Sequence, residues 1–184
     1  MQPIKLLQIG YNSEWALAKF YPAVFADERF ELQAVAGLER DAKGAWDKLI
    51  DEQMWRLEAL KGGDIWRAEN TRTERMSADT VKDRIADGEI TYYPASVLLD
   101  NSFHLDSLEA VMIHSPNTTH LDYIKKFVGM GLHILCEKPL VTVTDQAHVA
   151  QRGDLWALDE LISEIGISSV LMDCEHYSAK KASR

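Results

Sequence analysis

The chain has 184 residues, of which 46% are hydrophobic, an ordinary proportion for a protein that folds around a core. Its formal net charge of −9 argues against nucleic acid as the main partner, because phosphate binding requires a basic surface. No apolar run is long enough to span a membrane, and the start, MQPIKLLQIG, lacks the layout of a secretory signal. Both cysteines, Cys136 and Cys174, lie in apolar runs, which favours buried free thiols in a reducing compartment. We therefore expect a cytoplasmic protein with neither a nucleic-acid nor a membrane partner.

The first predicted strand, residues 4–9, ends in a turn that is typical of dinucleotide-binding units. A G-x-G-x-x-G pattern begins at Gly10, but Asn12 stands where the second glycine belongs and Trp15 where the third belongs. The second glycine lets the backbone approach a pyrophosphate, and the third lets helix and strand pack closely. Asparagine tolerates a positive φ better than most residues, so Asn12 is a partial substitute, whereas Trp15 must point away or push the helix outward. The predicted cofactor-binding residues of this turn are Gly10, Tyr11, Asn12 and Ser13.

A second predicted strand, residues 31–37, ends two residues before the acidic side chain of Glu39. In a dinucleotide-binding unit, an acidic residue at this strand end accepts hydrogen bonds from the adenosine ribose hydroxyls. Its charge repels a 2′-phosphate and so favours NAD over NADP, although Arg40 beside it can reverse that preference. We predict Glu39 and Arg40 as cofactor-binding residues, with NAD as the cofactor and NADP as the alternative.

The region 41–88 is longer than a single crossover between parallel strands requires. Apolar residues at helical spacing predict a helix that ends at the pair Gly62-Gly63, and after a polar stretch Ser77 begins a second, shorter helix. We interpret the region as a helical crossover with an insertion. Residues 91–93 follow as a short third strand.

The most informative stretch, residues 108–140, has the order strand, turn, helix, glycine stop, strand. Its apolar run 110–113 precedes the polar cluster 114–117, and its run 132–136 precedes the pair Glu137-Lys138. This order predicts a βαβ crossover, which places two parallel strands side by side with the helix over one face. Both polar clusters then lie at the carboxyl ends of neighbouring strands, the edge where open α/β sheets bind ligands.

Strands and helices continue to alternate toward the end of the chain, with a helix around residues 155–165 and a last strand beginning at 169–172. Six strands alternating with helices predict an α/β fold with a doubly wound parallel sheet of the Rossmann type, ordered 3-2-1-4-5-6. We expect one dinucleotide-binding domain over residues 1–184. An exposed apolar edge or face of such a sheet allows self-association, so a homo-oligomer is possible.

Two motifs of the central stretch resemble the nucleotide domain of Gfo/Idh/MocA oxidoreductases, the group of glucose–fructose oxidoreductase and inositol dehydrogenase. They are SPNTTH at residues 115–120 and CEKP at residues 136–139, each at a strand end. The resemblance extends from the first strand to about Tyr177 and is poorest over 41–88. It implies a nicotinamide cofactor and hydride transfer to or from a sugar- or polyol-like alcohol. The implied partners are a dinucleotide and a small-molecule substrate.

The resemblance also implies roles for individual residues. The position of Lys138 is implicated in proton transfer, and a partly desolvated lysine at a strand end can have its pKa lowered enough to move a proton. The position of Glu137 lies near the nicotinamide ribose. The other cofactor-binding candidates lie in the first polar cluster or just after it. They are His114, Ser115, Pro116, Asn117 and His120.

The sequence departs from the family pattern in three ways. The glycine fingerprint is reduced to Gly10, and the residues after the last strand read Glu175-His176-Tyr177 where members carry arginine. The second α/β domain, which bears the substrate groups, is absent from the 184 residues, so we expect the fragment alone to be inactive. A non-catalytic dinucleotide sensor or a degenerate inactive domain is therefore the alternative. The histidines and cysteines show no ligand spacing, so no metal is predicted.

Overall fold

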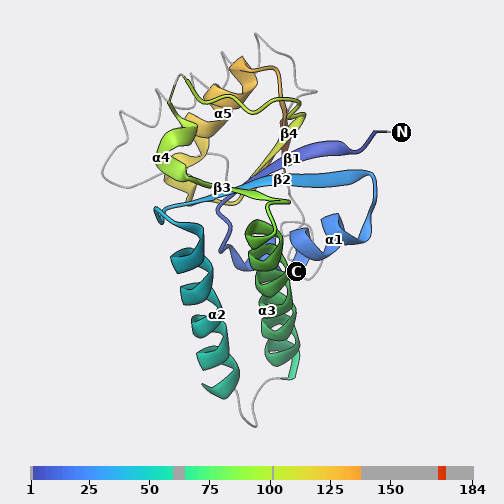
Figure 1. Ribbon diagram of the computed structural model, residues 1–184, viewed down its shortest axis with the longest axis vertical. Coiled ribbons are helices and arrows are strands. Elements are labelled where there is room, and N and C mark those ends of the chain that lie inside the picture. Colours follow the sequence, from blue (N-terminus) through green and yellow to red (C-terminus); the bar gives the residue numbers. More distant parts are fainter. Residues whose placement is uncertain (1, 60–64, 101, 138–169, 173–184) are drawn as a thin grey trace, which may run out of the picture.

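A six-stranded parallel sheet forms the centre of the computed structural model, which describes residues 2–59, 65–100, 102–137 and 170–172 (Figure 1). Its strands are β1 (Ile4–Ile9), β2 (Phe30–Gly37), β3 (Thr91–Pro94), β4 (Ala110–Ile113), β5 (His133–Cys136) and β6 (Val170–Met172). Every neighbouring pair is parallel, in the order β3-β2-β1-β4-β5-β6. The predicted fold class and strand order are confirmed.

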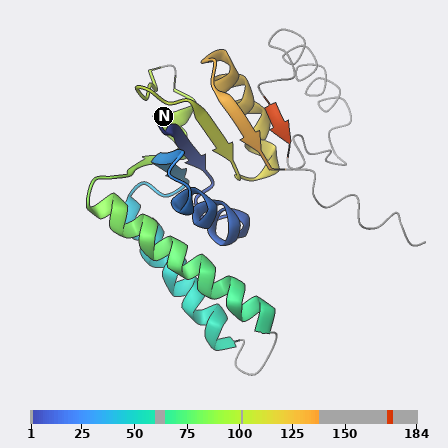
Figure 2. The ribbon, with the colours of Figure 1, turned by 90° about the vertical axis from the view of Figure 1, so that its right-hand side faces the viewer.

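Helices cover both faces of this sheet. They are η1 (Ala16–Phe20), α1 (Tyr21–Ala26), α2 (Ala42–Ala59), α3 (Ile65–Ala86), α4 (Ala95–Leu98), η2 (Asn117–Thr119) and α5 (His120–Gly129). Helices α4 and α5 lie over one face, whereas η1, α1, α2 and α3 lie on the other (Figures 1 and 2). None of the helices in the described ranges is long and apolar enough to cross a membrane.

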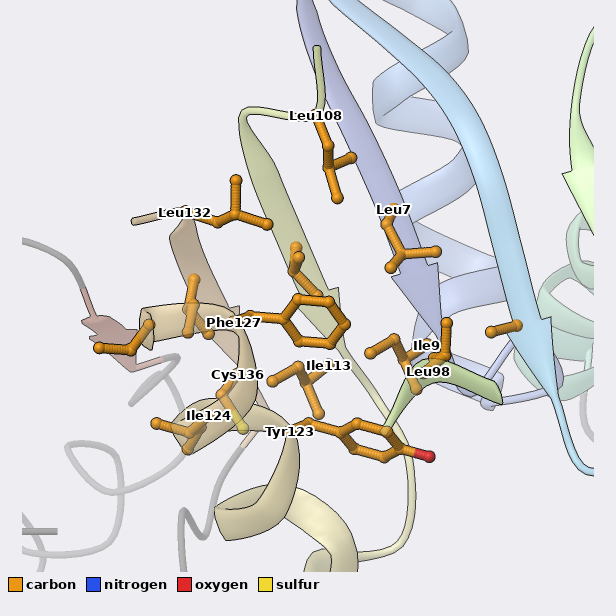
Figure 3. Close-up of a cluster of buried hydrophobic side chains, with 14 of the residues drawn as sticks. Leu7, Ile9, Leu98, Leu108, Ile113, Tyr123, Ile124, Phe127, Leu132 and Cys136 are labelled. Carbon is orange, nitrogen blue, oxygen red and sulfur yellow. The ribbon is translucent and has the colours of Figure 1, made fainter. Parts of the chain in front are cut away.

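Strand β1 contributes to two hydrophobic clusters because its successive side chains point to opposite faces of the sheet. Leu7 and Ile9 pack with Phe127 of α5 in the cluster that Figure 3 shows, and Leu6 packs in the cluster under η1 and α2. Leu7, Ile9 and Phe127 are at most 1% exposed. The strand is therefore buried on both faces, as its almost unbroken apolar sequence predicts.

The helical segment after β1 widens into the π-helix η1 at residues 16–20 and then continues as α1. Pro22 has no backbone N–H to donate, and a proline inside a helix also displaces the preceding turn. The N–H of Tyr21 reaches back to the carbonyl of Ala16, five residues earlier. The proline thus accounts for the π-turn next to the predicted pyrophosphate site.

The prediction for the region between β2 and β3 is wrong in one respect. The polar stretch 68–75, expected to separate two helices, lies inside the 22-residue helix α3. Its inward face carries Thr71 and Glu74, each 6% exposed, ahead of Ala78 and Val81. Because polar side chains occupy these buried positions, an apolar period does not reveal this part of the helix. Helices α2 and α3 lie side by side and extend away from the sheet (Figures 1 and 2).

Candidate functional site

The turn after β1 lies directly against the end of β4. Gly10 has a φ of +82°, and its N–H donates to the carbonyl of Ala36 in β2 at 3.0 Å. The N–H of Ser13 donates back to the carbonyl of Gly10 at 3.1 Å and closes the turn. A Cβ atom at Gly10 would lie 2.5 Å from the carbonyl oxygen of His114. Only glycine suits both this conformation and this approach, so the turn and the first polar cluster are in contact.

Asn12 does not replace the second glycine in the way the sequence suggested. Among the described residues other than glycine, only Ser107 has a positive φ, so Asn12 adopts an ordinary backbone conformation. The turn requires left-handed backbone only at Gly10. Asn12 is exposed and Ser13 is half-buried, and both lie just ahead of the helix. The start of a helix is where backbone N–H groups donate hydrogen bonds to a bound anion.

Trp15, at the position of the third glycine, lies over a side chain of the neighbouring strand end. Its indole stacks on the imidazole of His114, with ring centroids 5.6 Å apart and planes 21° from parallel. The side chain does not point away from the strand ends, as one of the two expected outcomes had it; it lies toward the end of β4, with 39% of it exposed. Trp15 therefore covers His114 from the helix side.

His114 lies beneath the edge of the sheet and is only 7% exposed. The amide nitrogen of Gln8 donates to the carbonyl of Ile9 at 3.1 Å, so its amide oxygen, 3.0 Å from His114 Nδ1, is the acceptor for that ring nitrogen. Gln8 is fully buried in β1. The pair joins β1 to the end of β4 below the surface that a ligand would reach.

Hydrogen bonds fix the loop that follows β4. The hydroxyls of Ser115 and Thr119 lie 2.8 Å apart, and that of Thr119 donates to the carbonyl of Pro116 at 2.7 Å. His120 is fully buried at the start of α5, and its Nε2 donates to the carbonyl of Ser115 at 2.7 Å. Ser115 and Asn117 stay half-buried. His120 thus supports the loop from below, while Ser115 and Asn117 remain accessible at the edge.

Tyr11, predicted from its place in the turn, has its side chain beneath the turn, 2% exposed. Its ring centroid is 4.7 Å from that of Trp46 in α2. A Cβ atom at Gly37 would come within 2.2 Å of the tyrosine ring, so the end of β2 must be glycine to admit it. The phenol donates a hydrogen bond to Oε2 of Glu39, the cofactor-binding residue predicted at the end of β2, at 2.9 Å. No pattern in the linear sequence indicates this link between the two residues.

A second tyrosine holds the backbone of Glu39. The hydroxyl of Tyr92 in β3 donates to the carbonyl of Glu39 at 3.0 Å. Burial, followed by the nearby charge of Glu39, raises the pKa of Tyr92 to about 12. Burial and the hydrogen bond to Glu39 raise the pKa of Tyr11 even further above its ordinary value. Both phenols are therefore protonated donors at neutral pH, and Arg40 beside them is exposed.

The end of β5 lies next to the end of β4. Ile113 pairs with Cys136, and the N–H of Glu137 donates to the carbonyl of Ile113 at 2.9 Å. Glu137 is half-buried at this edge. Cys136 is a buried free thiol, and burial, with a smaller effect of Glu137, raises its pKa to about 12. Lys138 lies outside the described residues, as do Cys174 and His176.

The parallel order β2-β1-β4-β5 therefore brings the candidate groups to one edge of the sheet. Three strand spacings of about 4.8 Å separate the first group from the last, an edge roughly 14 Å long. In order along it are Glu39, the turn 10–13, the loop 114–117 and Glu137. Within the described ranges no group of three or more His, Cys, Asp or Glu side chains is placed to hold a metal ion.

Comparisons with known proteins agree with this architecture. The Gfo/Idh/MocA family model, described as an oxidoreductase family with an NAD-binding Rossmann fold, matches residues 31–155. D-xylose 1-dehydrogenase (NADP(+)) 2 of Haloferax volcanii is 49% identical over 41 residues, which cover 22% of this chain and 13% of that protein. Two of the solved structures that match show the same fold at low sequence identity.

The first of these structures is KijD10, a 3-ketoreductase from Actinomadura kijaniata with bound NADP and TDP-benzene. It has a TM-score of 0.51 and 22% identity over 89% of this chain and 35% of that one. The second is an oxidoreductase from Desulfitobacterium hafniense, described as NADPH-dependent, with a TM-score of 0.52 and 18% identity over 96% of this chain and 35% of that one. The chain thus spans about a third of the length of the structures it matches.

Replacing Gly10 tests whether the contact between the turn and β4 holds the site. Gly88 has a similar φ of +77° but nothing within 4 Å of an added Cβ atom, so Gly88→Ala isolates the backbone strain, about 1–2 kcal/mol. Gly10→Ala adds a clash with backbone atoms, and we expect it to lower the free energy of unfolding by about 2–5 kcal/mol. Urea unfolding followed by tryptophan fluorescence measures both. An equal loss of unfolding free energy in the two variants would contradict a close contact between Gly10 and His114.

Proposed function

Since the chain belongs to the Gfo/Idh/MocA family of oxidoreductases with an NAD-binding Rossmann fold, we propose that it binds its dinucleotide across the carboxyl ends of β2, β1, β4 and β5. Bound there, the cofactor serves hydride transfer to or from a sugar- or polyol-like alcohol. The observation that carries the proposal is the contact of the Gly10 turn with the end of β4, which joins two predicted half-sites.

The described side chains fit such a cofactor. Glu39 presents a half-buried carboxylate at the end of β2, suited to ribose hydroxyls, which are hydrogen-bond donors. Gly10, Tyr11 and Ser13 donate their N–H groups within the fold, so Asn12 and the start of the following helix supply the backbone N–H groups suited to a pyrophosphate. Ser115, Asn117 and Glu137 supply polar atoms at the next two strand ends, suited to the nicotinamide half. Binding, orientation and exclusion of water are the functions we assign to these residues.

Lys138 is the residue we propose for proton transfer, because it follows Glu137 at the end of β5. A nicotinamide bound at this edge would supply the acceptor for the hydride that leaves the carbinol carbon of the alcohol. The neutral amine of Lys138 takes the hydroxyl proton in that step, and the alcohol becomes a carbonyl compound. A lysine that is partly desolvated beside a cofactor can have a pKa low enough to supply a neutral amine near neutral pH.

We propose NAD(H) as the preferred cofactor. The charge of Glu39 faces the position of the ribose, where a 2′-phosphate would be repelled. The relatives named above include an NADP(+)-dependent dehydrogenase and a reductase with NADP bound. Exposed Arg40 is the group that a 2′-phosphate would use instead.

The domain organisation and cellular setting are also part of the proposal. Residues 1–184 constitute the dinucleotide-binding domain, and 41–88 are its helical crossover with an insertion. Substrate groups come from a separate α/β domain, consistent with the match covering only 35% of each of the two solved structures. The buried free thiol of Cys136 supports a cytoplasmic location. Exposed Trp55 and Met76, each 70% exposed, support self-association through the α2–α3 pair.

Titration with NADH and with NADPH, followed by nicotinamide fluorescence, tests cofactor binding. We expect saturable binding of both and a lower Kd for NADH, because Glu39 favours ribose hydroxyls over a 2′-phosphate. ADP-ribose is the control, since it should compete for the same site. Absence of binding at millimolar concentrations of both cofactors would remove the proposal.

Replacing Lys138 distinguishes an enzyme from a binding protein without activity. In a preparation that oxidises a sugar or polyol, we expect Lys138→Ala to lower kcat by about 10²–10⁴-fold and to leave the Kd for NADH nearly unchanged. Lys125→Ala, at an exposed position of α5, is the control and should retain wild-type turnover. Full turnover in Lys138→Ala would assign the proton transfer to another group.

A further inference from the structure

We infer that Tyr11 is a positioning residue that sets the preference for NADH over NADPH by holding the carboxylate of Glu39 in one orientation. The inference rests on the proposed function, since it concerns the same site. It adds a residue whose side chain lies beneath the site and whose effect on the cofactor passes through Glu39.

The hydrogen bond between the two side chains occupies one carboxylate oxygen. Tyr11 donates to Oε2 of Glu39 at 2.9 Å, and its hydroxyl is also 3.4 Å from the carbonyl of Ala45 in α2. A carboxylate offers two oxygens, so the second one, Oε1, is the acceptor for a ribose hydroxyl. With Oε2 fixed, Oε1 has a defined direction relative to the end of β2.

The tyrosine can fix the carboxylate because its own ring is confined. The ring is 2% exposed, lies against Gly37 of β2 and is tilted against the indole of Trp46. Its backbone belongs to the turn that begins at Gly10. Tyr11 therefore connects the predicted pyrophosphate turn to the ribose position by a single rigid side chain.

A fixed carboxylate and a mobile one discriminate differently between the two cofactors. When it is fixed, Glu39 accepts from the ribose and keeps its charge where a 2′-phosphate would lie, so NADPH binds more weakly than NADH. When it is released, the side chain rotates toward solvent, the ribose loses an acceptor, and exposed Arg40 is left to pair with the phosphate. Release therefore raises the Kd for NADH and lowers the Kd for NADPH.

Tyr92 provides a matched control, because it also donates a hydrogen bond to Glu39. Its hydroxyl donates to the backbone carbonyl of Glu39 at 3.0 Å and not to the carboxylate. Its ring centroid lies 5.9 Å from that of Tyr11, so both phenols share one environment. Tyr92→Phe removes a comparable hydrogen bond to Glu39 and leaves the carboxylate of that residue held by Tyr11.

The experiment measures the Kd of NADH and of NADPH for the wild-type chain, Tyr11→Phe, Tyr92→Phe, Glu39→Gln and the double variant Tyr11→Phe/Glu39→Gln, with nicotinamide fluorescence as the signal. We expect Tyr11→Phe to reduce the preference for NADH by about three- to tenfold and Tyr92→Phe by less than about twofold. In the Glu39→Gln background, Tyr11→Phe should change the preference less than in the wild-type background, because only a ribose acceptor and no carboxylate charge remains to be positioned. Thermal unfolding of each variant separates these changes from loss of folded protein.

Glu39→Asp keeps the test decisive if Tyr11→Phe does not fold. It retains the charge but withdraws the carboxylate by one methylene, about 1.5 Å, from the tyrosine hydroxyl. We expect it to reduce the preference for NADH as Tyr11→Phe does. An unchanged preference in either variant, while both cofactors still bind, overturns the role of Tyr11 and leaves the proposed function intact. Failure of the wild-type chain to bind either cofactor overturns both.

Discussion

The site depends on one backbone contact, the approach of Gly10 to the carbonyl of His114. This approach requires a residue without a Cβ atom and with a positive φ, and it brings the turn after β1 onto the end of β4. Parallel pairing of β1 with β2 and β4 then fixes what lies on either side. Because this contact aligns the strand ends, the polar groups that a ligand across both halves of the sheet would contact lie along one edge.

Below this contact is a layer of buried polar side chains, and above it is a layer of accessible ones. Gln8, His114 and His120 form hydrogen bonds under the edge and join β1, the loop after β4 and the start of α5. Tyr11 has the corresponding place on the β2 side. Ser13, Glu39, Ser115, Asn117 and Glu137 form the half-buried upper layer. The side chains of several predicted cofactor-binding residues, Tyr11, His114 and His120, thus lie in the lower layer, a placement that depends on side-chain direction.

The parallel order of the strands could be predicted because apolar runs, glycine stops and the paired motifs agree with one another. The start of α3 could not, since Thr71 and Glu74 occupy its buried positions and mask the helical period. The candidate residues could be located at the sheet edge because each follows the end of a predicted strand, and the carboxyl ends of parallel strands lie at the same edge. The orientation of Trp15 over His114 and the reach of Tyr11 to Glu39 arise from packing between segments distant in sequence, for which a linear pattern carries no signal.

The central claim is that the dinucleotide lies over the carboxyl ends of β2, β1, β4 and β5. Amide chemical shifts of the ¹⁵N-labelled chain, recorded during a titration with NADH, test it most directly. We expect the largest shifts on residues 10–13, 39–40 and 114–117 and on Glu137. Shifts concentrated instead between η1, α2 and α3, in the pocket of about 680 Å³ lined by Trp15, Trp55 and Arg67, would contradict it.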